Sequence, residues 1–441
     1  MEAVDTLINA RWVVPVEPDG VVLQQHSIAL RAGRIIDILD SKQAAQRYAA
    51  REAVNLAYHA LIPGLINTHT HAAMSLFRGM ADDLPLSDWL NNHIWPAERR
   101  WVSSEFVRVG TQLAVAEMLK SGSTCFNDMY FFPETCAEVA EAAGVRACVG
   151  MIMIDFPSAW AATPEQYLEK GLALHDALRH SSLITTAFAP HAPYTVADAS
   201  LVKIRTLADE LEIAVHMHVH EATKEIEESM AQFQVRPLER LSRLGLLDPR
   251  LTAVHMTQLL PAEIDAIAES GVNVCHCPES NLKLASGVCP VPALMKAGVN
   301  VALGTDGPAS NNDLDMLSEM RTAALLAKGY SGDPTALPAR DALRMATLNG
   351  AKSLGIDDVV GSLSPGKAAD IVAVDLAEMA TQPVFDPVSQ IVYSTSRHQV
   401  SDVWVAGQQV LRERKLVTLD EEDILDSVAE WHNAITATSS T

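Results

Sequence analysis

The sequence predicts an α/β fold, a (β/α)8 TIM barrel accompanied by a small β-sandwich that is assembled from both ends of the chain. Three observations predict this fold. Eight short apolar runs alternate with amphipathic helical patterns from Leu61 onward. No glycine-rich phosphate loop follows the first run, which disfavours a doubly wound open sheet. The two flanks of this region show β patterning without intervening helices.

The eight predicted barrel strands begin at Leu61, Ser123, Val145, Leu183, Ile213, Leu251, Val272 and Val299. Amphipathic helical patterns separate most of them. One pattern, residues 105–122, is closed by a glycine, and another, residues 198–213, is opened by Asp198 as an N-terminal cap. Eight strand–helix repeats are typical of a parallel barrel, in which catalytic side chains lie where the strands end.

The flanks complete the predicted domain organisation. Residues 1–60 and 366–416 would form the β-sandwich domain together, because neither segment alone is large enough to form a stable domain. Residues 61–365 would form the metal-dependent catalytic barrel. Residues 417–441 would form a C-terminal helix and a polar tail.

Composition and charge exclude several classes of protein. The formal net charge of −22 opposes a general affinity for nucleic acid or for anionic membranes. The first residues do not resemble a leader sequence, and no apolar run is long enough to span a bilayer. We therefore expect a cytoplasmic protein, assembled as a homo-oligomer, that acts on a small molecule.

The six cysteines do not predict a disulfide framework in a chain of this length. The segment CHCP, Cys275–Pro278, lacks a second cysteine pair at zinc-finger spacing and lies within an apolar strand pattern. We expect its cysteines to be packed in the core and not bound to a metal.

Histidine and acidic residues gather at the ends of the predicted strands. They are His69, His71, His191, His216, His218, His220, Glu221, His255, His276 and Asp306. Side chains two residues apart share one face of a strand, so His69 and His71 project together. Nitrogen and oxygen donors without a thiolate are typical of a catalytic zinc or iron ion with an open position for water. The fifth strand should add a third histidine, but spacing alone does not choose among its three.

Five segments carry a specific resemblance to a known family. They are PGLINTHTH, HVHE, VHM, HCPESNLKLASG and GTDGPASNND. They match the His-X-His, His, His and Asp pattern of the amidohydrolase superfamily and resemble its 5′-methylthioadenosine/S-adenosylhomocysteine deaminase branch. The resemblance covers nearly the whole chain. It implies hydrolytic deamination of an adenine ring, which yields the inosine derivative and ammonia.

The resemblance also implies the metal ligands, which are His69, His71, His218 and Asp306. His218 is preferred to its two neighbouring histidines because Glu221 lies three residues after it, as in the His-X-X-Glu pattern of this branch. Many binuclear relatives carry a carboxylated lysine at the end of the fourth strand, where this chain has His191. We therefore expect one divalent ion, Zn²⁺ or alternatively Fe²⁺.

The catalytic roles follow from the same resemblance. Glu221 would protonate N1 of the ring and later help to deliver a proton to the leaving ammonia. Asp306 would take the proton of the attacking hydroxide, and His255 would hold that hydroxide or the tetrahedral oxygen.

The segment Asp88–Arg100 resembles the loop that binds the nucleoside in this branch. Trp89 would cover the nucleoside, and Glu98 would accept hydrogen bonds from both ribose hydroxyls. His191 would contact the purine or the ribose.

Two other classes of function stay open. One is a different reaction of the same superfamily, such as triazine dechlorination or guanine or cytosine deamination. The presence of Glu98 argues against these reactions, because its expected role is to contact a ribose. The other is a non-catalytic binding barrel, against which the complete set of four ligands argues. The zinc deaminases that edit nucleic acid carry a His-X-Glu and Pro-Cys-X-X-Cys pattern that this chain lacks.

The loop after the third strand, Gly150–Trp160, predicts the preferred substrate. Met151, Met153 and Phe156 suit the soft thioether of 5′-methylthioadenosine. The loop has no arginine or lysine to pair with the carboxylate of S-adenosylhomocysteine, and Asp155 would repel that carboxylate. We therefore expect S-adenosylhomocysteine and adenosine to be weaker substrates.

Overall fold

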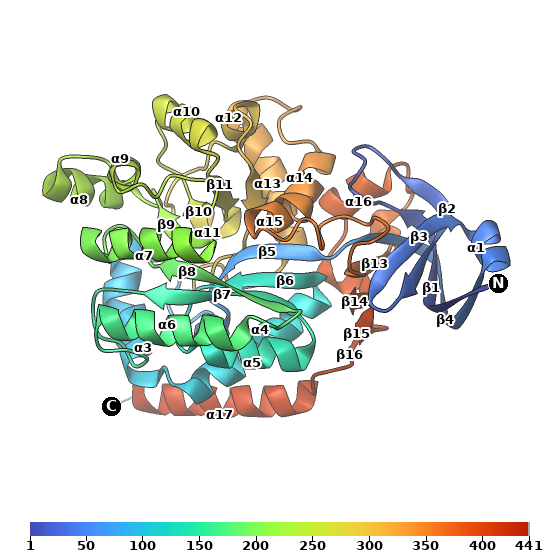
Figure 1. The fold of residues 1–441 in the computed structure, drawn as a ribbon, viewed down its shortest axis with the longest axis horizontal. Helices are drawn as coiled ribbons and strands as arrows, with labels where there is room; N and C mark the ends of the chain where they lie inside the picture. The colour runs from blue at the N-terminus through green and yellow to red at the C-terminus, as the bar shows by residue number, and fades with distance from the viewer. Residues whose placement is uncertain (440–441) are drawn as a thin grey trace.

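The computed structural model describes residues 1–439, and its two sheets confirm the predicted fold class (Figure 1). Eight parallel strands follow one another around a barrel in chain order. These are β5 (Leu65–Thr70), β6 (Ser123–Asp128), β7 (Arg146–Met153), β8 (Ile184–Pro190), β9 (Val215–Val219), β10 (Leu251–His255), β11 (Asn273–His276) and β12 (Val301–Leu303).

The barrel closes between its last and first strands. Thr68 Oγ1 donates to the carbonyl oxygen of Leu303 at 2.7 Å. The amide of Asp306 donates to the carbonyl oxygen of His69 at 3.0 Å. Gly304 permits this approach, because a Cβ at that position would lie 2.9 Å from the Cβ of His69. The strand ends that carry His69 and Asp306 therefore lie side by side.

Helices follow the strands and cover the outside of the barrel (Figure 1). The segment between β5 and β6 contains η1 (Ala72–Phe77), α2 (Leu86–Asp88), η2 (Trp89–Ile94), α3 (Trp95–Trp101) and α4 (Ser104–Lys120). The later helices are α5 (Pro133–Ala143), α6 (Pro164–Leu178), α7 (Asp198–Leu211), α8 (Thr223–Phe233), α9 (Pro237–Arg243), α10 (Pro261–Ser270), α11 (Pro278–Lys283), α12 (Val291–Lys296), α13 (Met316–Ser331), α14 (Ala339–Met345) and α15 (Leu348–Ser353).

The start of α7 differs from the prediction. Asp198 is the first helical residue, and Ala197 occupies the capping position. The carboxylate of Asp198 instead accepts a hydrogen bond from Nε of Arg240 at 2.7 Å. The aspartate therefore joins α7 to α9 and does not cap the helix.

The two ends of the chain form the second sheet, beside the barrel (Figure 1). Its N-terminal part is β1 (Glu2–Val13), β2 (Leu23–Arg31), β3 (Arg34–Asp40), α1 (Ser41–Arg47) and β4 (Tyr48–Pro63). Its C-terminal part is β13 (Ile371–Asp375), η3 (Met379–Thr381), α16 (Pro387–Tyr393), η4 (Arg397–Gln399), β14 (Val400–Val405), β15 (Gln408–Arg412) and β16 (Lys415–Leu416). The strand order is β16-β15-β14-β13-β4-β1-β2-β3, and β4 pairs antiparallel with β13 at its centre.

The predicted first barrel strand is in fact divided between the two sheets. Residues 61–63 end β4 of the terminal sheet, and the barrel strand begins at Leu65. Gly64 lies between them, and its amide donates to the carbonyl oxygen of Asp370 at 3.0 Å. The division into a domain of residues 1–60 and 366–416, a barrel of residues 61–365 and a C-terminal segment of residues 417–441 stays our proposal.

A buried ion pair joins the barrel to the terminal sheet. Arg146, at the start of β7, binds Asp370, just before β13, through Nε–Oδ2 at 2.8 Å and Nη2–Oδ1 at 3.1 Å. The two side chains are only 8% and 2% exposed. The amide of Ala406 also donates to Asp370 Oδ1 at 2.8 Å, so the carboxylate is fully engaged.

The C-terminal helix α17 (Glu421–Ser439) packs along α4 and η1 (Figure 1). The ring of Trp431 stands edge-on to Phe106, with the ring centroids 5.3 Å apart, and to Trp101 at 6.4 Å. The predicted polar tail reaches into residues 440–441, which lie outside the described residues. Among residues 1–439, no helix combines the length and the apolar character needed to cross a membrane.

Candidate metal centre and substrate cavity

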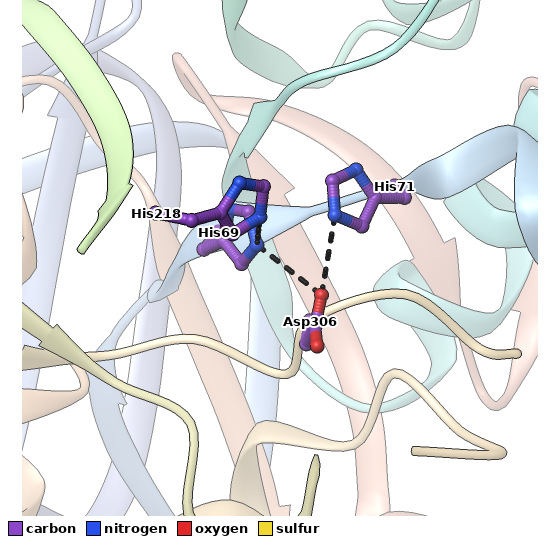
Figure 2. A group of neighbouring side chains, drawn as sticks. All are labelled: His69, His71, His218 and Asp306. Atoms are coloured by element: carbon purple, nitrogen blue, oxygen red, sulfur yellow. Dashed lines mark hydrogen bonds and ion pairs between the residues drawn. The ribbon is translucent and has the colours of Figure 1, made fainter. Parts of the chain in front are cut away.

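The four predicted metal ligands lie together at the carboxyl ends of the barrel strands (Figure 2). His69 and His71 come from the end of β5, His218 from β9, and Asp306 from the loop after β12. Their ligand atoms all lie within 4.8 Å of one another. Asp306 Oδ1 is 3.2 Å from Nε2 of His69 and 3.3 Å from Nε2 of His71. Nε2 of His218 is 3.1 Å from Nε2 of His69.

The outer nitrogens of these histidines bind backbone and side-chain groups. His71 Nδ1 donates to the carbonyl oxygen of Met129 at 2.6 Å, and His218 Nδ1 donates to that of His191 at 2.6 Å. An imidazole whose Nδ1–H is held in this way presents the lone pair of Nε2 to the centre of the cluster. This is the orientation and tautomer that a metal ion requires.

The other strand-end histidines do not face this cluster of ligand atoms. Nε2 of His216 is 2.9 Å from Nδ1 of His69, so His216 lies behind a ligand. Nε2 of His220 accepts the amide of Leu238 at 3.2 Å. His276 is buried at the end of β11, outside the cavity described below. None of these three histidines therefore belongs to the ligand cluster. His216 and His218 share one face of β9, but His216 lies two residues earlier along the strand and therefore deeper in the barrel.

Charges within the cluster favour a cation. Burial lowers the pKa of His69 to about 4 and lowers that of His218 well below its ordinary value, so both rings are neutral. Burial also acts on Asp306 and His71, but hydrogen bonding between them holds the pKa of the carboxyl well below its ordinary value and raises that of His71 to about 9. A divalent ion would replace this proton on His71.

Asp306 is held in place by its second oxygen. Oδ2 accepts the hydroxyls of Ser280 at 2.6 Å and Ser310 at 2.8 Å. The residue has a left-handed backbone with φ of +64°, a conformation that costs energy in a non-glycine residue and is typical of functional sites. Three imidazole nitrogens and one fixed carboxylate therefore fit a divalent metal.

Glu221 and His255 lie next to the metal cluster. Glu221 Oε1 is 3.8 Å from Nε2 of His255. His255 Nδ1 lies 2.9 Å from Oδ1 of Asn281, which fixes the plane of the ring. Burial raises the pKa of Glu221, so that its carboxyl group retains a proton closer to neutral pH than an exposed glutamate does.

A cavity of ≈ 90 Å³ lies over the cluster. Its polar lining consists of His71, Glu98, Tyr130, His191, Tyr194, His218, Glu221, His255 and Asp306. Trp89 also lines it, and the indole N–H of this residue is buried without a hydrogen-bond partner among residues 1–439. The remaining lining is apolar, and none of the described lysine and arginine residues contributes to it. An apolar cavity with a few converging polar groups is the usual form of a small-molecule site.

The comparison with known families decides the identity of this fold. Residues 60–410 match the amidohydrolase family.

The chain belongs to the amidohydrolase family.

Three relatives of this amidohydrolase are similar along almost its whole length. A 5-methylthioadenosine/S-adenosylhomocysteine deaminase of Teredinibacter turnerae is 50% identical over 98% of both chains. A 5′-deoxyadenosine deaminase of Methanothermobacter thermautotrophicus is 42% identical, covering 92% of this chain and 93% of its own. The crystal structure of an adenosine deaminase from Xanthomonas campestris with bound zinc is 52% identical, covers 99% of both chains and gives a TM-score of 0.98.

The predicted substrate residues of the amidohydrolase all line the cavity. Trp89 opens the π-helical turn η2, a distortion that often marks functional segments, and Glu98 follows on α3. Burial raises the pKa of Glu98 to about 7, which the neighbouring Tyr130 hydroxyl opposes. His191 Nδ1 lies 3.0 Å from the hydroxyl oxygen of Thr195, and burial lowers the pKa of this histidine to about 3.

The loop after β7 differs from the sequence-based expectation. Phe156 lines the cavity, but Met151 and Met153 do not, because the residues of this segment that face inward are Ile152 and Ile154. Met151 instead faces α6. A Cβ on Gly171 of that helix would lie 3.0 Å from the Cβ of Met151. The expected substrate contacts of both methionines are therefore wrong.

Asp155 also lies away from the cavity. Its carboxylate accepts the amide of Ala197 at 2.7 Å and the hydroxyl of Ser200 at 2.9 Å. It therefore fixes the start of α7 and would not repel a substrate carboxylate.

Four positioning residues were missed in the sequence. Ser280 and Ser310 hold Asp306, Asn281 holds His255, and Asp128 holds the chain on both sides of His71. Asp128 Oδ1 accepts the hydroxyl of Thr70 at 2.9 Å and the amide of Ala72 at 2.7 Å. Three of the four stand inside the segments that carried the family resemblance, which is the signal that could have found them.

Proposed function

We propose that this amidohydrolase hydrolyses the adenine ring of 5′-methylthioadenosine to the inosine derivative and ammonia, and that it accepts S-adenosylhomocysteine and adenosine less well. The observation that carries the proposal is the arrangement of Glu221 beside the four-ligand cluster, in one cavity with Glu98 and Trp89. The names of the relatives that are 50% and 42% identical support adenosine derivatives as the substrate class.

A single zinc ion is the proposed cofactor. The structure that is 52% identical contains zinc, and the donor set of three imidazoles and one carboxylate suits that metal. The proposal of one ion per chain rests on His191, which follows β8 at the position where binuclear relatives carry a modified lysine. His69, His71, His218 and Asp306 would hold the ion. When bound, it would lower the pKa of a water molecule and so supply a nucleophile near neutral pH.

Glu221 is the proposed proton carrier. It gives a proton to N1 of the adenine ring, which makes C6 electrophilic, and then helps to deliver a proton to the amino group that leaves as ammonia. The oxygen of water replaces that amino group at C6. The burial that raises the pKa of Glu221 suits a group that must hold a proton near neutral pH.

Asp306 and His255 act on the attacking water. Oδ1 of Asp306 takes its proton, while Oδ2 stays bound to Ser280 and Ser310. With its ring plane fixed by the contact between Nδ1 and Oδ1 of Asn281, His255 holds the attacking water or the tetrahedral oxygen through Nε2.

The nucleoside is held by the segment that contains η2 and α3. The ionised Glu98 accepts both vicinal hydroxyls of the ribose, Trp89 covers the nucleoside, and His191 contacts the purine or ribose. The apolar side of the cavity, which includes Phe131, Ile152 and Phe156, receives the 5′-methylthio group. The preference for this group is supported by the absence of lysine and arginine from the described lining of this cavity.

Ammonia release tests the proposal directly. The purified protein with one equivalent of zinc is assayed with 5′-methylthioadenosine, S-adenosylhomocysteine, adenosine, guanine, cytosine and a chlorotriazine. For the chlorotriazine, release of chloride is measured instead, because hydrolytic dechlorination forms no ammonia. We expect the highest kcat/KM for 5′-methylthioadenosine and formation of its inosine derivative. Turnover of a nucleobase or triazine with none of the adenosine derivatives would contradict the proposal.

Cytoplasmic location and homo-oligomeric assembly stay predictions from the sequence. The molar mass of the protein in solution, measured by light scattering after gel filtration, tests the second of them.

A further inference from the structure

A second cavity of ≈ 80 Å³ adjoins the substrate cavity. The two cavities share Trp95, Glu98, Phe131 and Phe156 as lining residues. None of the four metal-ligand candidates lines the second cavity, so it extends the site away from the metal cluster. The remaining lining residues are Arg99, Val102, Pro157, Ser158 and Ala159.

Two aromatic residues, Trp95 and Phe156, line both cavities. The centroids of Trp95 and Phe156 lie 6.3 Å apart, with an angle of 63° between the ring planes. Phe156 is 40% exposed, so close packing does not fix its ring. A change of its side-chain rotamer would join the two cavities into one.

The proposed position of the ribose directs the 5′ substituent towards this second cavity. Glu98 lines both cavities and is the proposed acceptor for the ribose hydroxyls. The 5′ carbon of a nucleoside is attached to C4′, the ring neighbour of the carbon that bears the 3′ hydroxyl. A tail at the 5′ position therefore leaves the ribose close to Glu98 and to the ring of Phe156.

Among the described residues, Arg99 is the one lysine or arginine in the combined lining of the two cavities. Within residues 1–439 its guanidinium makes no hydrogen bond and no ion pair, and its side chain is exposed. The next residue, Arg100, differs because its guanidinium lies over the ring of Trp101, 5.1 Å from the centroid. The guanidinium of Arg99 therefore remains available to a ligand.

We infer that Arg99 determines specificity for an acidic 5′ tail, by binding the carboxylate of S-adenosylhomocysteine in the second cavity. This inference rests on the proposed function. The methylthio group of the smaller substrate ends near the two aromatic rings and does not reach Arg99. A guanidinium pairs with a carboxylate through two parallel hydrogen bonds, which a neutral side chain cannot reproduce. The cation that the loop after β7 lacks is thus supplied by α3.

Arg99→Gln tests the inference through ratios of kcat/KM. Three substrates are compared: 5′-methylthioadenosine, S-adenosylhomocysteine, and the analogue of the latter whose carboxylate is replaced by hydrogen. The ratio for S-adenosylhomocysteine relative to 5′-methylthioadenosine should fall about tenfold, mainly through KM, as expected for a partly exposed charged hydrogen bond. The ratio for the decarboxylated analogue should not fall, and Arg99→Lys should restore part of the loss.

Arg100→Gln is the matched control, and it should leave all three ratios as in the wild type. An unchanged ratio for S-adenosylhomocysteine in Arg99→Gln would overturn the inference, as would an equal loss with the decarboxylated analogue. Both outcomes leave the proposed function intact. The proposed function fails only if the wild-type protein does not deaminate 5′-methylthioadenosine.

Discussion

The imidazole of His218 is fixed by the backbone of His191, whose carbonyl oxygen accepts the Nδ1–H of His218 at 2.6 Å. The rings of the two residues also lie close together, with centroids 4.9 Å apart. A candidate metal ligand on β9 is thus oriented by a candidate substrate residue that follows β8. Any shift of one strand end would move the metal site and the nucleoside site together.

Replacement of His218 should remove the metal. His218→Asn should weaken zinc binding by more than about 100-fold, because a ligand is lost in addition to the orientation that outer contacts supply. Zinc content per chain after dialysis against a chelator measures the effect. His220→Asn is the control, since His220 binds the amide of Leu238 and faces away from the cluster. Loss of zinc in the control alone would refute the assignment.

Replacement of Glu221 should abolish proton transfer and spare the metal. Glu221→Gln should lower kcat for 5′-methylthioadenosine by about 10²–10⁴-fold, the usual contribution of a general acid–base residue. Glu228 lines a further cleft of ≈ 780 Å³, which Glu221 also borders, and Glu228→Gln should behave as the wild type. Ammonia release and zinc content are measured on the same samples. Full activity in Glu221→Gln would show that Glu221 does not transfer a proton in the reaction.

Binding of ribosides should improve as the pH rises. Burial raises the pKa of Glu98 to about 7, so that the carboxyl is increasingly protonated below that value. The ionised form is the better acceptor for two hydroxyls, and KM for 5′-methylthioadenosine should therefore fall with rising pH. A bound cation favours ionisation and moves the inflection below 7. Glu98→Gln should raise KM and remove this pH dependence. A KM that rises with pH over the same range would exclude this role.

Breaking the ion pair between Arg146 and Asp370 should destabilise the protein. Asp370→Ala leaves a buried guanidinium without its partner, which costs about 3–5 kcal/mol. The midpoint of urea-induced unfolding measures the loss. The double variant Arg146→Met/Asp370→Leu should be more stable than Asp370→Ala, because no charge is then left unpaired. Equal stability of Asp370→Ala and the wild type would show that the pair contributes nothing to the interface.

The sequence predicts the barrel well because strand and helix alternate with clear periodicity, and it predicts the ligand set through the spacing of short motifs. It does not divide the run from Leu61 to Thr70 correctly. Residues 61–70 are all buried, and the residues on both sides of Gly64 are apolar, so nothing local shows that the chain changes sheets there.

The sequence also does not show which side chains of a strand point into the cavity. Met151 and Ile152 are both apolar and adjacent, and only the twist and register of β7 decide which one faces the cavity. The role that we infer for Arg99 was hidden for a related reason. It comes from a helix far from the third strand in the sequence, and only the fold brings that helix beside Phe156.

The pairing of β4 with β13 has a consequence for synthesis of the chain. β4 leaves the ribosome about 300 residues before its partner, which at about 5–20 residues per second is a delay of roughly 15–60 s. Throughout this interval the hydrogen-bonding edge of the apolar end of β4, residues 60–63, is uncovered, and such an edge readily pairs with other nascent chains. The nascent N-terminal segment is thus the part of this protein that most needs protection by chaperones. Proteins shortened before Ile371 should aggregate even where every residue of the metal cluster is present.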